Sequence, residues 1–226
     1  MATVNIVEAY GLARVYLGDV EVWAVNEIDL VVRRGEIVAV LGPAGAGKTT
    51  LLNLIGGYDP PSMGRVIVDG VSVTNIQGNE LADFRRERVG HVPQVVRMIP
   101  SLSVLRNVTL PLLPYRRALD FDVDARAREL LVALGLGGRE GQYPLALADG
   151  DLERAAIARA LISYPPLLLL DEPSASLGRD ADGAVLNLID RLNREYGLSV
   201  ILATRDQGVA EVADRVVRMD KGVLKA

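Results

Sequence analysis

The chain has 226 residues, half of them apolar and 24% charged, a composition that predicts a folded domain and excludes a disordered chain. It has no Cys and one His, which argues against disulfides, thiolate nucleophiles, Cys- or His-rich metal sites and a Ser-His-Asp triad. The net charge of −4 argues against a dedicated nucleic-acid binder.

The first third of the chain is rich in β-strand signals. Residues 22–32 and 37–41 are predicted strands, and the second is a continuous apolar run typical of a strand buried on both faces. A helix is predicted over residues 47–55, ended by two glycines. Residues 65–69 and 71–73, separated by Asp69 and Gly70, predict a hairpin.

The middle of the chain is predicted to be helical, and the last third alternates strands and helices. Helices are expected over residues 104–113, 123–134 and 152–162, so roughly 95–151 forms a helical lobe. Strands are expected at 167–171 and 199–203, helices at 181–196 and 209–213, and a hairpin over 215–224. This alternation predicts an α/β fold with a largely parallel sheet.

No stretch approaches the roughly 18–20 apolar residues that span a bilayer. The first ten residues lack a basic segment followed by an apolar one, so no signal peptide is expected. A cytoplasmic chain is therefore predicted.

The strand at 37–41 runs directly into a phosphate-binding loop of the pattern G-x-x-x-x-G-K-[ST]. The loop residues are Gly42, Pro43, Ala44, Gly45, Ala46, Gly47, Lys48, Thr49 and Thr50. Glycines let successive N–H groups point at one anion, and the helix that follows adds its positive end. Lys48 is expected to bind the β- and γ-phosphates of a nucleotide, and the Thr49 hydroxyl to ligate Mg²⁺.

A second acidic motif follows the buried strand at 167–170. Asp171 emerges at the carboxyl end of that strand, where ligands bind in open α/β sheets, and is expected to hold Mg²⁺. Glu172 is expected to act as general base on a water molecule that attacks the γ-phosphate.

Three further residues could belong to this site. Gln94 could contact Mg²⁺ or the attacking water, and Tyr16 could stack on an adenine ring. His91 is better explained as a structural residue than as a ligand.

In their order along the chain, these residues resemble the ATP-binding-cassette (ABC) transporter ATPases, over residues 16–223. The similarity is greatest to the lipoprotein-release and macrolide-export branch. It is carried by Glu21-Val22-Trp23-Ala24-Val25, by the segment 51–61 that begins Leu-Leu-Asn-Leu, and by the segment 106–113, Arg-Asn-Val-Thr-Leu-Pro-Leu-Leu.

The resemblance implies a single domain over 1–226, with a P-loop NTPase (RecA-like) core, an antiparallel β lobe and a helical lobe. It implies ATP and Mg²⁺ as ligands, a second ABC ATPase domain and transmembrane permease subunits as partners, and a place on the cytoplasmic face of the cell membrane. It also implies that Tyr16 stacks on adenine and that Gln94 senses nucleotide and contacts the membrane partner.

Several positions depart from the family pattern. The signature Leu-Ser-Gly-Gly-Gln is replaced by Leu147-Ala148-Asp149-Gly150-Asp151. In the family this segment contacts the γ-phosphate bound to the other subunit. Here Ala148 lacks the Ser hydroxyl of that contact, and Asp149 adds a negative charge that repels phosphate. Arg205 stands where the family has its switch His, and is expected to contact the nucleotide. Gly178, in Ser176-Leu177-Gly178, replaces the Asp that comes after Ser-x-Leu in the family.

Two functions remain open on the residues. The first is a subunit that binds and hydrolyses ATP to energise export or extraction through a membrane partner. The second is a catalytically weak or inactive regulatory subunit that pairs with an intact ABC subunit. A soluble ABC protein of DNA repair or translation is disfavoured, because a single acidic cassette lacks long insertions and tandem domains.

Overall fold

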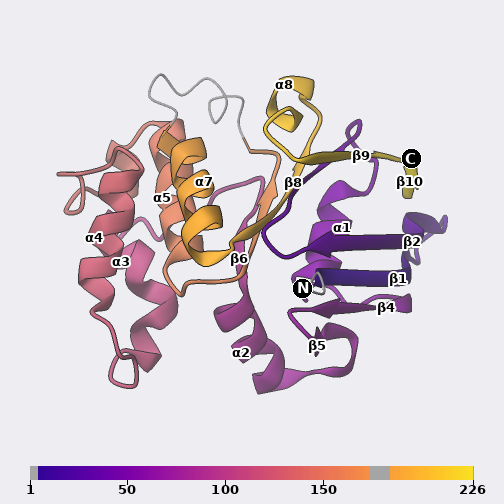
Figure 1. Cartoon of the computed structure of the whole chain (residues 1–226), viewed down its shortest axis with the longest axis horizontal. Helices are drawn as coiled ribbons and strands as arrows, with labels where there is room; N and C mark the ends of the chain where they lie inside the picture. Colours follow the sequence, from indigo (N-terminus) through magenta and orange to yellow (C-terminus); the bar gives the residue numbers. More distant parts are fainter. Residues whose placement is uncertain (1–4, 174–183, 226) are drawn as a thin grey trace.

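The computed structural model describes residues 5–173 and 184–225. Two sheets and a group of helices form the molecule (Figure 1).

Along the chain, the strands are β1 (Asn5–Tyr16), β2 (Val22–Arg33), β3 (Ile37–Leu41), β4 (Met63–Val68), β5 (Val71–Ser72), β6 (Val89–Val92), β7 (Leu167–Asp171), β8 (Ser199–Thr204), β9 (Arg215–Asp220) and β10 (Val223–Lys225). The α-helices are α1 (Lys48–Ile55), α2 (Gly78–Arg88), α3 (Val104–Thr109), α4 (Val123–Ala133), α5 (Asp149–Leu161), α7 (Ala184–Tyr196) and α8 (Gln207–Ala210). Short 3₁₀ helices follow β5 and α3, at Val73–Asn75 and Leu110–Tyr115, and a third lies between α4 and α5, at Pro144–Ala146.

The central sheet has the strand order β10-β9-β3-β8-β7-β6, in which all strands except β10 run parallel. The smaller sheet, β2-β1-β4-β5, is antiparallel. This arrangement agrees with the predicted α/β fold, which has a largely parallel central sheet, an antiparallel β lobe and a helical lobe. Because β3 and β7 are neighbours of β8, their carboxyl ends open on the same edge of the sheet.

The central strands are buried on both faces, as their continuous apolar runs predict. On β3, Val38 and Val40 pack with α1 and the small sheet, whereas Ala39 and Leu41 pack with the helices on the opposite face. Helices α3, α4, α5 and α7 gather on that side, and α1 lies toward the small sheet (Figure 1).

Three elements were not predicted individually: β1, α2 and β6. Helix α2 has one buried residue, Phe84, and therefore no apolar stripe for sequence reasoning to find. Strand β1 carries Gly11 with a φ of +53° and several register shifts that break its alternation. Strand β6 contains Gly90, whose added Cβ would lie 2.6 Å from the Ala160 carbonyl oxygen of α5.

Helix α5 begins at Asp149, three residues earlier than the predicted start at 152. Residues 149–151 therefore form its first turn. No helix within 5–173 or 184–225 is both long and apolar enough to cross a bilayer.

Candidate nucleotide site

The phosphate loop connects β3 to α1, and two of its three glycines have no room for a side chain. A Cβ added to Gly42 would lie 2.1 Å from the Met219 carbonyl oxygen of β9. A Cβ added to Gly47, whose φ is +100°, would lie 1.9 Å from the Ala24 carbonyl oxygen of β2. Glycine is therefore required at both positions, because β2 and β9 pack directly against the loop.

The turn between β9 and β10 supports the loop from the far end of the sequence. The Gly222 N–H donates to the Ala46 carbonyl oxygen over 2.9 Å, and the Asn26 N–H donates to the Gly222 carbonyl oxygen over 2.8 Å. Gly222 thus links the phosphate loop to β2.

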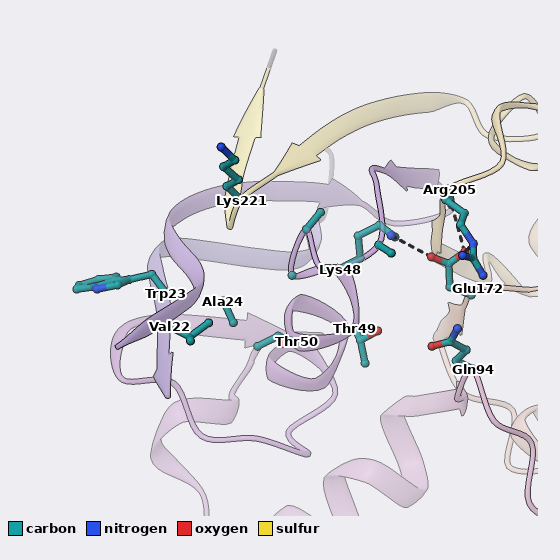
Figure 2. A pocket seen from close by; sticks show the side chains of 14 residues that line it. Val22, Trp23, Ala24, Lys48, Thr49, Thr50, Gln94, Glu172, Arg205 and Lys221 are labelled. Carbon is teal, nitrogen blue, oxygen red and sulfur yellow. Dashed lines mark hydrogen bonds and ion pairs between the residues drawn. The ribbon is translucent and has the colours of Figure 1, made fainter. Parts of the chain in front are cut away.

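A pocket of about 460 Å³ opens beside the loop (Figure 2). One end is lined by the side chains of Val22, Trp23 and Ala24 from β2 together with Lys221, and the other by Gln94, Glu172 and Arg205. The loop residues that line it are Ala44, Gly45, Ala46, Gly47, Lys48, Thr49 and Thr50. One end of the pocket therefore carries polar and charged side chains of both signs, whereas the other is more apolar apart from Lys221.

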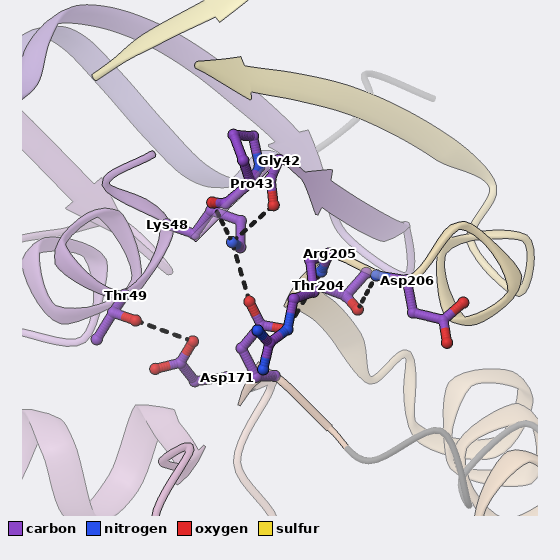
Figure 3. Close-up of polar contacts among 9 residues, drawn as sticks. Gly42, Pro43, Lys48, Thr49, Asp171, Thr204, Arg205 and Asp206 are labelled. Atoms are coloured by element: carbon purple, nitrogen blue, oxygen red, sulfur yellow. Dashed lines mark hydrogen bonds and ion pairs between the residues drawn. The ribbon is translucent and has the colours of Figure 1, made fainter. Parts of the chain in front are cut away.

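Lys48 is 5% exposed and its ammonium group has three close oxygen partners. Lys48 Nζ donates to the carbonyl oxygens of Gly42 and Pro43 over 2.8 and 3.0 Å (Figure 3). It also lies 2.9 Å from Glu172 Oε1 (Figure 2). The predicted phosphate-binding lysine and the predicted general base are thus in direct contact.

The two predicted Mg²⁺ ligands also meet. Thr49 Oγ1 donates to Asp171 Oδ1 over 3.2 Å (Figure 3). Burial, with the charge of Glu172 beside it, raises the pKa of Asp171 above its usual value, whereas the Thr49 hydroxyl and Lys48 oppose the shift. A hydroxyl and a carboxylate brought together in this way form the oxygen donor set that Mg²⁺ prefers.

Glu172 sits at the end of β7 with a φ of +46°, in the left-handed region that non-glycine residues rarely adopt. Its N–H donates to the Ala203 carbonyl oxygen over 2.8 Å. Its Oε2 accepts from the Arg205 N–H over 3.1 Å and lies 3.9 Å from Arg205 Nε. The end of β8 therefore places Arg205 beside Glu172.

Tyr16 and His91 lie away from this pocket's lining. The Tyr16 hydroxyl donates to Asp59 Oδ2 over 3.0 Å, and the Arg14 guanidinium lies 4.8 Å from the centre of its ring. Tyr16 pairs across the strands with Val22, which does line the pocket. His91 lies on β6 with its ring 4.7 Å from the Tyr58 ring, and burial lowers its pKa to about 4.

The ABC transporter family profile matches residues 25–175. The chain belongs to this family. It is 41% identical over 215 residues to the lipoprotein-releasing system ATP-binding protein LolD of Chromohalobacter salexigens, covering 95% of the chain and 90% of that protein. It is 38% identical to the macrolide export ATP-binding/permease protein MacB of Rhodopirellula baltica, covering 97% of the chain but 32% of that protein. These relatives confirm the branch that the sequence indicated.

The fold agrees with solved ABC cassettes. The dimeric structure of the cassette MJ0796 bound to ADP and phosphate superposes with a TM-score of 0.90 at 32% identity, covering 97% of both chains. CbiO1 of Clostridium perfringens, part of the transporter complex CbiONQ, gives a TM-score of 0.82 at 27% identity, covering 98% of the chain and 87% of CbiO1.

This ABC chain departs from the family pattern in three places: the start of α5, Arg205 after β8, and Gly178. Ala148 is the N-cap of α5 and provides no side-chain hydrogen bond, and the exposed Asp149 begins the first turn. Asp151, by contrast, is buried and forms ion pairs with Arg139 and Arg154. Gly178 lies outside the described residues.

Sequence reasoning missed four pocket residues: Val22, Trp23, Ala24 and Lys221. The first three come from the edge of the small sheet, and Lys221 comes from the β9–β10 turn. Only packing of those elements against the phosphate loop brings them to the site, so no local pattern could assign them.

Proposed function

We propose that the chain binds MgATP and hydrolyses it as the ATP-binding subunit of an ABC transporter that drives export or extraction. The observation that carries this proposal is the meeting of Lys48, Thr49, Asp171 and Glu172 at one edge of the central sheet. Lys48 provides the buried cation for phosphate, and Glu172 accepts a proton from the attacking water.

Thr49, Asp171 and Gln94 are the residues proposed to hold Mg²⁺. When bound, the ion would neutralise charge on the phosphate groups. The loop residues Gly42 to Thr50 are proposed to bind the phosphates and Arg205 to contact the nucleotide. Tyr16 is proposed to stack on adenine, since its strand partner Val22 lines the apolar end of the pocket.

The partners proposed are a second ABC ATPase domain and transmembrane permease subunits. MacB combines ATP-binding and permease parts by name, and this chain spans about a third of it. A cassette over 1–226, with a helical lobe at about 95–151, is proposed to act with transmembrane permease subunits on the cytoplasmic face of the cell membrane.

A second candidate is a nucleotide-binding regulatory subunit with little turnover. Three features at the γ-phosphate contacts favour it: Ala148 has no hydroxyl, Asp149 presents an exposed carboxylate, and Arg205 cannot shuttle a proton.

ATP binding and phosphate release by the purified chain separate these candidates. Lys48→Ala is expected to weaken ATP binding by about 100-fold, and Glu172→Gln to keep binding but lower turnover by about 100-fold or more. Asp190→Asn serves as control, because it removes an exposed carboxylate on α7. Equal turnover in wild type and Glu172→Gln would exclude hydrolysis by Glu172 and favour the regulatory subunit. Absence of ATP binding in the wild type would overturn both.

A further inference from the structure

The ammonium group of Lys48 has no spare hydrogen. An ammonium carries three donors, and Lys48 Nζ has three oxygen partners within 3.0 Å, namely the carbonyls of Gly42 and Pro43 and the carboxylate of Glu172. Since Lys48 is 5% exposed, water does not offer it other partners freely. A phosphate oxygen can gain this lysine only by replacing one of the three.

Glu172 is the partner that can leave. The two carbonyls belong to the phosphate loop itself, whose backbone is fixed by close contacts with β2 and β9. The Glu172 carboxylate is a side-chain anion at the edge of the pocket, and an anion is what a phosphate would replace.

Arg205 holds the other oxygen of the same carboxylate. Its N–H donates to Glu172 Oε2 over 3.1 Å, and its Nε lies 3.9 Å from that oxygen. The carboxylate therefore bridges Lys48 and Arg205 (Figure 2). The Arg205 side chain is 63% exposed and lines the pocket. It can therefore keep Glu172 close after the contact between Glu172 and Lys48 has broken.

We propose that in the nucleotide-free chain Glu172 occupies the terminal-phosphate position on Lys48, that nucleotide must expel it, and that Arg205 is the positioning residue that retains it. This inference rests on the proposed function, because the displacing group is the phosphate of a bound nucleotide. The chain's own carboxylate then competes with the ligand and lowers its affinity. Expulsion leaves Glu172 in contact with Arg205 alone, at the pocket where Glu172 is proposed to accept a proton from the attacking water.

Nucleotide titrations test the competition. The single Trp of the chain, Trp23, lines the pocket, so its fluorescence can report binding. ADP and a non-hydrolysable ATP analogue are titrated with and without Mg²⁺. Glu172→Gln, which removes the competing charge, is expected to bind both nucleotides about 3–10-fold more tightly, also in EDTA. Arg205→Ala keeps the backbone N–H and is expected to change nucleotide affinity by about 2-fold. Asp190→Asn is expected to leave nucleotide affinity unchanged.

A second measurement needs no nucleotide. The chain has three lysines, Lys48, Lys221 and Lys225, and the last two are exposed. An amine-reactive reagent followed by mass spectrometry is expected to label Lys48 several-fold faster in Glu172→Gln than in wild type, with Lys221 and Lys225 unchanged as internal controls.

The outcomes separate the two levels of the argument. If wild type binds neither nucleotide, the proposed function fails. If wild type binds but Glu172→Gln binds equally or more weakly, and Lys48 labelling does not rise, the nucleotide site stands and the competition by Glu172 is overturned.

Discussion

Two ion-paired groups, Lys48 with Glu172 and Asp151 with its two arginines, differ in what lies next to them. Lys48 and Glu172 meet at the edge of a pocket of about 460 Å³, whereas Asp151 lies between Arg139 and Arg154 at the start of α5, with 8% of its side chain exposed. The first pair can exchange one partner for a ligand. The second can only hold the first turn of α5 against the residues before it. A buried ion pair therefore indicates a binding site when a pocket adjoins it, and a structural contact when none of its members is free to leave.

Gly47→Ala is expected to have the largest effect on the first region. Its Cβ would collide with the Ala24 carbonyl at a φ of +100°, so unfolding free energy should fall by about 3 kcal/mol and nucleotide affinity by about 100-fold. Gly45→Ala is the matched control: its φ is +75° but nothing lies within 4 Å of the new Cβ, so a loss of about 1 kcal/mol is expected. Urea unfolding and nucleotide titration check both, and equal losses in the two variants would contradict the packing argument.

Asp151→Ala tests whether the second pair is purely structural. It leaves Arg139 and Arg154 without their shared carboxylate, and unfolding free energy should fall by about 3 kcal/mol. Nucleotide affinity of the folded variant should be unchanged. Asp149→Ala, two residues away and exposed, is expected to change stability by about 0.5 kcal/mol. A loss of nucleotide affinity in Asp151→Ala would show that the two regions are coupled.

His91 lies on β6, the strand that packs on α5 and leads to Gln94. Its pKa of about 4 in the folded chain is below that of the unfolded chain, so the unfolded state binds more protons as pH falls. Stability should therefore fall between about pH 6.5 and pH 4, by about 2 kcal/mol. His91→Phe, which keeps a ring beside Tyr58, should lack this loss. Denaturation at pH 7 and pH 4.5 measures the loss of unfolding free energy. An equal loss in wild type and His91→Phe would refute the attribution of this loss to His91.

Ala148→Ser is expected to have the smallest effect. The N-cap of α5 has no side-chain hydrogen bond, and a Ser hydroxyl there should stabilise the fold by about 1 kcal/mol. Ala146→Ser, on an exposed residue of the preceding 3₁₀ helix, should change stability by less than about 0.5 kcal/mol. Thermal unfolding compares them, and a gain no larger than that of the control would mean that the cap is already satisfied.

The sequence predicted those parts of the fold that a local pattern specifies. The apolar runs of β3 and β7 identified buried central strands, and the phosphate loop, Asp171 and Glu172 follow directly from them. It did not predict α2, whose only buried residue is Phe84, because a polar helix has no periodic signal.

The orientation of the acidic residues at α5 also escaped prediction. Asp149 and Asp151 both replace family residues, yet one is exposed and the other lies between two arginines. That difference depends on the start of α5 at Asp149 and on Arg139, twelve residues earlier than Asp151 in the chain. Only the three-dimensional arrangement separates a charge that faces outward from one that faces inward.

The Gly222 contact has a consequence for how the protein is made. The phosphate loop is synthesised early, but the turn that hydrogen-bonds to Ala46 and Asn26 lies close to the end of the described chain. A nascent chain therefore exposes a loop whose support has not yet emerged from the ribosome. We expect nucleotide capture to wait for the β9–β10 hairpin, so that strands translated well after the phosphate loop decide when the site becomes competent.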